Sequence, residues 1–243
     1  MSNNLLTPDN DPMGRAIADF FSTGKAAKLK VLSSQFDDDE IPVAHLFRTF
    51  SGMSALEQTA LRLAEGKILD CGAGSGCHSL ALQEMGKDVT AIDISPLSAE
   101  VMEKRGVKNV LQANLFELPA IQEFDTVLML MNGSGIIGKL NNMESFFTKM
   151  KQILKPGGSI IMDSSDLKYL FEEEDGSYAI NLAGDYYGEI DFRMQYKKVK
   201  GETFNWLYID FQTLSLYASQ FGFKATLLQE GEHYDYLARV SML

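Results

Sequence analysis

The chain has 243 residues, of which 45% are hydrophobic, 10% aromatic and 23% charged, a composition typical of a globular protein. Its 33 acidic and 22 basic residues give a net charge of -11. Because such a surface repels phosphate backbones, duplex DNA and structured RNA are disfavoured as partners. No apolar run is long enough for a membrane span, and the N-terminus lacks the basic and apolar regions of a signal peptide. With two cysteines and no secretion signal, the expected location is the cytoplasm.

From residue 66 onward, short apolar runs alternate with amphipathic stretches, which is typical of a parallel sheet covered by helices. The expected strands cover residues 67–70, 88–93, 109–113, 124–131 and 159–163. The expected helices between them cover residues 77–85, 96–105 and 143–154. Segment 124–131 is almost entirely apolar, so we expect it to be a central strand buried on both faces.

The C-terminal third is less regular. Residues 187–196 and 203–209 predict two strands that form a hairpin inserted into the sheet order. A helix over 211–220 then precedes strands at 223–229 and 236–241, with a tight turn between them. The last strand is therefore expected to run antiparallel to its neighbours.

The first 64 residues are expected to form a helical lid outside the sheet. Apolar residues at helical spacing predict one amphipathic helix over 13–21 and a second over 53–63. The acidic runs 37–40 and 172–175 are interpreted as solvated loops. Because no repeat or low-complexity linker is present, we expect a single domain over 1–243, with an α/β core over 65–243.

The strongest functional pattern is the run from Asp70 to Gly76 (DCGAGSG), placed between an expected strand and helix. Its glycines allow close backbone approach to a ligand, and the following helix presents free N–H groups. A dinucleotide motif G-x-G-x-x-G would need glycine where the chain has Cys77. The carboxylate of Asp70 suits a positively charged amino group, and Asp93, at the end of the next strand, suits the two hydroxyls of a ribose. The alternative is a tight strand-to-helix turn with no ligand.

In these segments the chain resembles the class I S-adenosylmethionine-dependent methyltransferases. The resemblance rests on 68–76 (ILDCGAGSG), 89–95 (VTAIDIS), a third strand ending near Asn114, 124–132 (FDTVLMLMN) and 154–162 (LKPGGSIIM). It implies a Rossmann-like α/β fold with a seven-stranded, mostly parallel sheet of order 3-2-1-4-5-7-6, whose last strand is antiparallel. It also implies S-adenosylmethionine as cofactor and S-adenosylhomocysteine as product.

The resemblance assigns cofactor contacts to residues at the ends of the first four core strands. The implied residues are Asp70, Gly72, Ala73, Gly74 and Gly76 by the methionyl part, Asp93 and Ile94 by the ribose, Asn114 and Leu115 by the adenine, and Met131 after the fourth strand. Asn114 departs from the family, which commonly has aspartate there. Its amide can accept a hydrogen bond through the carbonyl and donate through the NH₂.

No catalytic base and no metal site are assigned. Methyl transfer from a sulfonium mainly requires alignment and exclusion of water, and a base only where the acceptor loses its proton early. Cys71 and Cys77 are too few for a zinc site, and His78 is expected to pack or cap a helix. The acceptor should lie over the carboxyl ends of the strands. Candidates on that side are His45, Arg48, Asn132, His233 and Tyr234.

Each of these candidates also has a structural interpretation. His45 and His233 can be surface or packing residues, and Asn132-Gly133 can be only a turn. Arg48 lies within the expected lid segment 45–50 (HLFRTF). It either forms a surface salt bridge or keeps its guanidinium free to meet a carboxylate of the cofactor or acceptor.

The predicted function is methyl transfer from S-adenosylmethionine to a small molecule. One alternative is a methyltransferase that acts on protein or RNA, and another is a non-catalytic S-adenosylmethionine-binding protein. A nicotinamide-dependent oxidoreductase is disfavoured by Cys77. The oligomeric state is left open.

Overall fold

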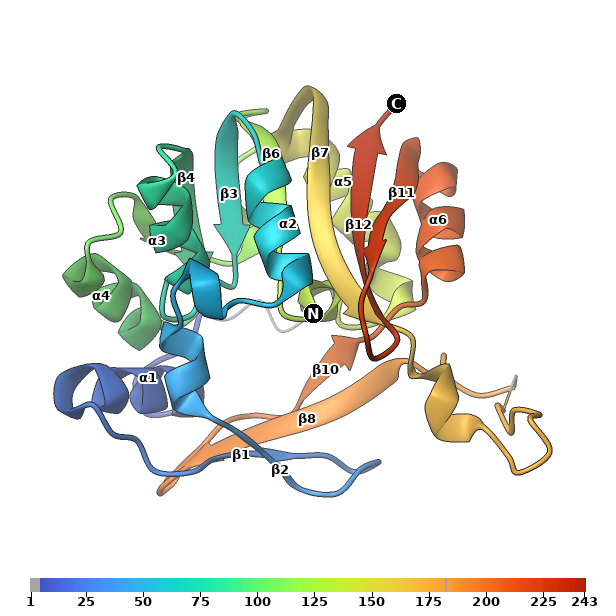
Figure 1. Ribbon diagram of the computed structural model, residues 1–243, viewed down its shortest axis with the longest axis horizontal. Helices are drawn as coiled ribbons and strands as arrows, with labels where there is room; N and C mark the ends of the chain where they lie inside the picture. The colour runs from blue at the N-terminus through green and yellow to red at the C-terminus, as the bar shows by residue number, and fades with distance from the viewer. Residues whose placement is uncertain (1–4, 182) are drawn as a thin grey trace.

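A computed structural model describes residues 5–181 and 183–243 and contains two β-sheets (Figure 1). The large sheet has seven strands in the order β11-β12-β7-β6-β3-β4-β5. Their bounds are β3 (Lys67–Cys71), β4 (Asp88–Asp93), β5 (Val110–Gln112), β6 (Phe124–Met129), β7 (Leu154–Ser165), β11 (Phe223–Glu230) and β12 (Asp235–Met242). β12 is antiparallel to both of its neighbours, whereas β3 to β7 pair in parallel. The predicted order 3-2-1-4-5-7-6 is confirmed.

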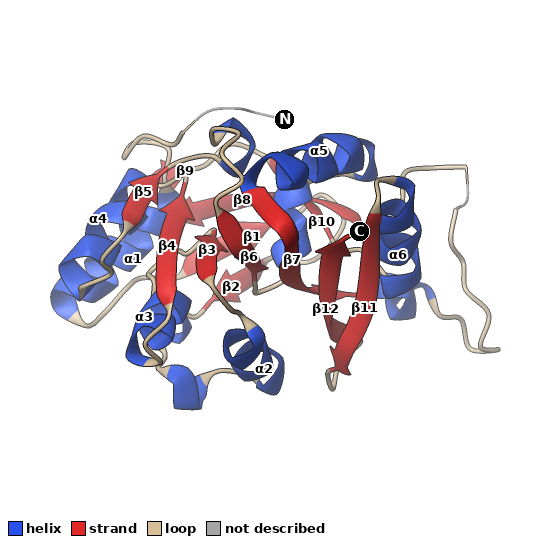
Figure 2. Ribbon diagram, turned by 90° about the horizontal axis from the view of Figure 1, so that it is seen from above, coloured by secondary structure: helices blue, strands red, loops and turns tan. Residues whose placement is uncertain are grey.

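Helices cover both faces of the large sheet (Figure 2). These helices are α2 (Ala55–Leu63), α3 (Cys77–Glu84), α4 (Pro96–Arg105), α5 (Met143–Ile153) and α6 (Phe211–Gln220). α1 (Pro12–Thr23) packs instead against α4 and the smaller sheet. α5 and α6 bury their apolar residues in the largest core, and α2 and α3 form a second core on the opposite face. Burial of these apolar faces is the main stabilising contribution to the fold.

The smaller sheet corrects the expected position of the hairpin. Its strands are β1 (Leu29–Leu32), β2 (Asp39–Ile41), β8 (Glu189–Tyr196), β9 (Val199–Lys200) and β10 (Phe204–Leu207). They pair antiparallel in the order β10-β8-β1-β2, with β9 beside β8. The predicted hairpin therefore forms, but it pairs with the N-terminal segment and is not inserted into the large sheet.

The N-terminal segment is likewise not purely helical. Both expected helices are present as α1 and α2, and β1 and β2 lie between them. The acidic run 37–40 is exposed, as expected of a solvated loop, but its last two residues belong to β2. β2 and β1 are only three and four residues long, too short for a periodic pattern to reveal them. β1 is held as a strand by its pairing with β8 on one side and β2 on the other.

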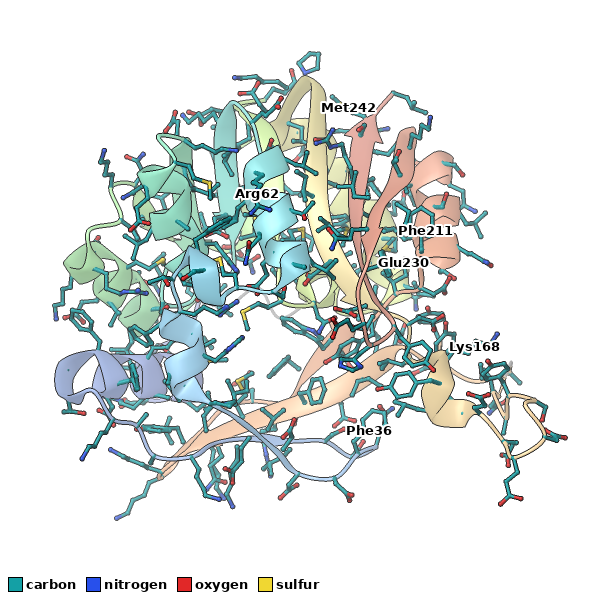
Figure 3. All side chains as sticks on the ribbon, in the orientation of Figure 1. Phe36, Arg62, Lys168, Phe211, Glu230 and Met242 are labelled. Atoms are coloured by element: carbon teal, nitrogen blue, oxygen red, sulfur yellow. The ribbon has the colours of Figure 1, made fainter. Side chains whose placement is uncertain are left out.

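The second sheet lies across the carboxyl ends of the parallel strands (Figure 1). Side chains of both sheets point into the space between them (Figure 3). The ligand side of an open α/β sheet is this same edge. No helix in the described part of the chain is long and apolar enough to cross a membrane.

Candidate active site

The glycine turn after β3 is fixed by backbone hydrogen bonds to β4. The N–H groups of Gly72 and Ala73 both donate to the Ile92 carbonyl, at 2.9 and 3.0 Å. Gly72 and Gly74 have φ angles of +68° and +56°, which favour glycine. The turn therefore leads from the sheet edge into α3 with its backbone groups close to the site where a ligand would lie.

Gly76, at φ +82°, has a packing role as well. A Cβ at this position would lie 2.9 Å from the side chains of Met102 and Val107. The third glycine of the turn thus allows α3 to begin close against α4.

Asp93 lies at the carboxyl end of β4, as predicted, and is joined to the glycine turn. Its Oδ2 accepts from the Gly74 N–H at 2.8 Å and its Oδ1 from the Ser95 N–H at 2.9 Å. Burial raises the pKa of Asp93 to about 6. A carboxylate offers about four lone-pair sites, so two acceptor sites remain for the hydroxyls of a ribose.

Asp70 lies buried at the carboxyl end of β3. It is 1% exposed and accepts from the Ser79 hydroxyl at 2.6 Å, which ties the end of β3 to α3. Burial raises its pKa. In this structure Asp70 therefore supports the glycine turn from the α3 side.

The end of β5 carries the residues expected beside the adenine. The side-chain amide oxygen of Asn114 accepts from the Phe116 N–H at 3.0 Å, which caps a short 3-10 turn, and Leu115 is 4% exposed. Ile94, directly after Asp93, is 39% exposed. Asn114 thus keeps its NH₂ group and a second lone pair of the carbonyl for other partners.

Asp11 joins the N-terminal segment to the same edge, which the sequence analysis did not predict. It is fully buried, and its carboxylate accepts from the Gly14 N–H at 2.7 Å and from the Ser95 hydroxyl. The Leu6 N–H also donates to the Ile94 carbonyl at 3.0 Å. The Asp-Pro pair at the start of α1 is a helix N-cap signature, but its contact with Ser95 has no sequence signal.

The turn after β6 is held by Asp163 of β7, a second residue that the sequence analysis missed. Its two carboxylate oxygens accept from the N–H groups of Met131 at 3.1 Å and Gly133 at 3.0 Å. Met131 and Asn132 both have left-handed backbone conformations, with φ of 65° and 57°. The Asn132 amide oxygen accepts from the Ser165 hydroxyl at 2.8 Å. Burial raises the pKa of Asp163 to about 6.

Arg48 forms a buried ion pair, which corrects both the surface salt bridge and the free guanidinium. The side chains of Arg48 and Glu57 are each 6% exposed, and Arg48 donates to the Glu57 carboxylate. Glu57 also bonds the ring Nε2 of His78 at 2.7 Å. Burial raises the pKa of Glu57, but the hydrogen bonds with His78 and Arg48 outweigh it and lower the pKa to about 2. His78 packs, as expected.

The segment around Arg48 is fastened to the glycine turn. The Ser75 hydroxyl donates to the Leu46 carbonyl, and Arg105 donates to the Ser75 carbonyl at 2.6 Å. Within the described chain, the Nε of Arg48 is buried without a hydrogen-bond partner. The lid is therefore packed against the glycine turn, and it contains one buried donor without a partner, the Nε–H of Arg48.

The remaining acceptor candidates are exposed. His45 and His233 lie on the surface, and partial desolvation of the His45 ring, followed by the nearby Arg48 charge, lowers the pKa of His45. Tyr234 is 60% exposed and stacks on Tyr169, with ring centroids 4.6 Å apart.

The turn after β6 meets Trp206 of β10, whose indole ring occupies the position that a Cβ on Gly135 would take. Trp206 was not predicted, because only the docking of the second sheet brings it here.

Comparison with known proteins agrees with this geometry. A family model described as "Methyltransferase domain" matches residues 69–162. A solved structure of a SAM-dependent methyltransferase from Bacteroides fragilis, in complex with S-adenosyl-L-homocysteine, is 64% identical over 100% of both chains with a TM-score of 0.94.

Curated relatives are more distant. A cypemycin N-terminal methyltransferase from a Streptomyces species is 30% identical over 102 residues, which cover 41% of this chain and 42% of that protein. A ubiquinone biosynthesis O-methyltransferase from Xanthomonas euvesicatoria is 22% identical over 152 residues, 59% of this chain and 62% of that protein. The match thus spans about two fifths of the first of these relatives. On the full-length similarity to the Bacteroides fragilis protein, the chain belongs to the S-adenosylmethionine-dependent methyltransferases.

Proposed function

We propose that the protein methylates a small molecule held between the carboxyl edge of the large sheet and the second sheet. The observation that carries the proposal is the meeting of three elements at one edge. Asp93 is bonded to the glycine turn through Gly74, and Asp163 fixes the turn after β6 through Met131 and Gly133. The carboxyl edge of such a sheet is where the family's fold places its ligands.

The residues present fit S-adenosylmethionine. Gly72 and Gly74 put no side chain of their own over the backbone of the turn, and Asp93 retains acceptor sites for the ribose hydroxyls. Ile94 and Leu115 provide apolar contacts, and the amide of Asn114 suits the adenine edge. The buried, unsatisfied Nε–H of Arg48 is a donor suited to a carboxylate.

When bound, the cofactor supplies a methyl group made electrophilic by a positively charged sulfur. Asp93, Gly72 and Gly74 would hold the cofactor, which would supply this methyl group to an oxygen or nitrogen of the acceptor and leave as the neutral thioether. The chain contributes alignment and exclusion of water. The lid segment bonded to Ser75 and the second sheet cover the site from the side opposite the strands.

A small acceptor is supported by two further observations. The net charge of -11 disfavours nucleic acid, and the quinone-pathway relative is named for a small-molecule pathway. The peptide-modifying relative matches only over part of its length, so it defines a competing acceptor class for the experiment.

The test has two steps. Thermal unfolding with S-adenosylhomocysteine or NADH should show stabilisation by the former alone, by about 2.7 kcal/mol at 100 times its dissociation constant. Release of S-adenosylhomocysteine from S-adenosylmethionine is then measured with phenols, amines, a peptide and an RNA. Turnover with a small molecule supports the proposal, whereas turnover confined to the peptide or RNA contradicts it. Binding without turnover on any acceptor class would indicate a cofactor-binding protein instead.

A further inference from the structure

Three aromatic side chains share one face of the second sheet. Phe204 pairs with Phe192 across β10 and β8, and Trp206 pairs with Ile190, so all four project from the same face. The ring centroids of Phe192 and Phe204 are 6.3 Å apart, and those of Phe204 and Trp206 are 6.0 Å apart. The three aromatic side chains, Phe192, Phe204 and Trp206, are named here the aromatic face.

The aromatic face meets the carboxyl edge of the large sheet. The Trp206 ring lies against Gly135 in the 3-10 turn that follows β6 (Gly133–Ile137). The next residue of β10, Leu207, accepts a hydrogen bond through its carbonyl from the Ser134 hydroxyl at 2.7 Å. Figure 1 shows β8 and β10 on this side of the large sheet. The aromatic face therefore adjoins the turn that Asp163 holds at the proposed site of methyl transfer.

These rings are half-buried yet take no part in the cores of the described chain. The other end of the same face, at Met194 and Tyr196, packs against α1 in its own core. Phe192, Phe204 and Trp206 are partly exposed and belong to none of the hydrophobic clusters in residues 5–181 and 183–243. Large rings left half open at a reactive edge are a common binding surface for an apolar ligand.

The chemistry of the aromatic face selects against charged anions. Inward-facing residues of β8 are Ile190, Phe192, Met194 and Tyr196. Because side chains alternate along a strand, Arg193 and Gln195 point to the opposite face. The described strands of the second sheet thus place no cation on this face to bind a phosphate or carboxylate, and its rings favour offset stacking or edge contacts with another planar ring.

We propose that the aromatic face binds the methyl acceptor and selects an uncharged, planar aromatic ring that carries a hydroxyl or amino nucleophile. The inference rests on the proposed function, because it assigns the acceptor to the space opposite the Met131–Gly133 turn. It specifies the acceptor class and names Phe192, Phe204 and Trp206 as the residues that determine it.

Trp206 makes the inference directly measurable, because it is the single tryptophan of the chain. The emission of Trp206 is recorded with 295 nm excitation in the complex with S-adenosylhomocysteine. Three ligands are titrated separately into this complex: p-cresol, its saturated counterpart 4-methylcyclohexanol, and tetramethylammonium. Binding of S-adenosylhomocysteine itself is measured separately by calorimetry. The expected result is a saturable change in emission with p-cresol, at an affinity about fivefold or more above that for 4-methylcyclohexanol.

Two variants and a control test the residues. Phe192→Leu and Phe204→Leu should each weaken p-cresol binding about threefold or more while S-adenosylhomocysteine affinity and the melting temperature are retained. Tyr217→Leu removes a half-buried aromatic residue on α6 that packs against the core formed by α5 and α6, and it should change the affinity for neither p-cresol nor S-adenosylhomocysteine. Having two variants guards against one of them failing to fold.

The outcomes separate the inference from the function on which it rests. Three results would each overturn the inference. The first is equal affinity for p-cresol and 4-methylcyclohexanol, and the second is a preference for tetramethylammonium. The third is unchanged p-cresol binding in both phenylalanine variants. Each of these leaves the proposed function intact while S-adenosylhomocysteine still binds. Failure of the wild-type protein to bind S-adenosylhomocysteine would overturn the proposed function itself.

Discussion

The carboxylate of Asp93 accepts a hydrogen bond from the backbone N–H of Gly74 at 2.8 Å. This bond joins two motifs that lie 19 residues apart, the glycine turn after β3 and the acidic end of β4. The same carboxylate holds the Ser95 N–H, and the Ser95 hydroxyl in turn reaches Asp11 of the N-terminal segment. The proposed ribose site is thus a junction of three chain segments.

The raised pKa of Asp93 predicts that cofactor affinity depends on pH. Burial raises this pKa from its ordinary value of 3.8 to about 6. The ribose hydroxyls require the charged carboxylate, so binding below pH 6 must first remove a proton. S-adenosylhomocysteine affinity, measured by calorimetry, should fall about tenfold between pH 7 and pH 5. An Asp93→Asn variant should bind weakly with a flatter profile, and a wild-type affinity that is constant over this range contradicts the assignment.

A comparison of two glycines separates packing at α3 from backbone strain. Gly76 and Gly86 both have positive φ, of +82° and +76°, but only a Cβ on Gly76 would meet other side chains. Gly86→Ala should cost about 1–2 kcal/mol for the left-handed conformation alone. Gly76→Ala should lose about 1–3 kcal/mol more through the contacts with Met102 and Val107. Urea unfolding of both variants measures the difference, and equal losses would mean that α3 shifts freely.

Breaking the buried Arg48–Glu57 pair should strongly destabilise the fold. Glu57→Gln leaves the Arg48 guanidinium buried without its counter-charge and should lower the free energy of unfolding by about 3 kcal/mol. The exposed pair Lys28–Glu40 provides a matched control, since Glu40→Gln should cost less than about 0.5 kcal/mol. Chemical denaturation compares the two variants, and similar losses would show that burial adds nothing to the first pair.

The same pair has a defined pH window. The pKa of Glu57 is lowered from 4.5 to about 2, so the folded state binds its proton less readily than the unfolded state does. Its contribution is therefore present above pH 4.5 and is lost as the pH falls towards 2. Glu57→Gln should remove this part of the acid dependence of unfolding.

The lid should respond to the cofactor. Leu46 is bonded to Ser75 of the glycine turn, so ligand binding at the turn should slow opening of the lid. Amide hydrogen exchange across residues 36–51 is expected to slow with S-adenosylhomocysteine by more than exchange in α4 (Pro96–Arg105). Equal protection with and without ligand would leave residues 36–51 as scaffold.

Local sequence patterns predicted the core elements closely. α6 occupies the expected residues 211–220, and α4 occupies 96–105, because helix caps and apolar periodicity are encoded within each segment. Asp93 was found because the end of a strand followed by a helix start is a local signal. The order of the seven strands came instead from the family resemblance, since pairing in a parallel sheet has no local signature.

What escaped prediction depends on contacts between distant segments. β1 pairs with β8 along strands of four and eight residues, and neither strand shows the partner in its own sequence. The charge of Arg48 suggested a surface residue. Its side chain is buried because the lid docks on α2 and α3, a contact that the local sequence does not reveal. Asp163 and Trp206 reach the turn after β6 only in the folded chain.

The most direct test of the central claim is calorimetric binding of S-adenosylhomocysteine to wild-type protein, Asp93→Ala and Asp88→Ala. Asp88 is an exposed carboxylate at the opposite end of β4. Asp88→Ala is the control, because it removes one negative charge from the same strand outside the proposed site. Loss of two charge-assisted hydrogen bonds predicts that Asp93→Ala weakens binding at least about tenfold, with the fold retained and Asp88→Ala unchanged. An Asp93→Ala dissociation constant equal to that of the wild type would contradict the account, because the ribose would then lie elsewhere.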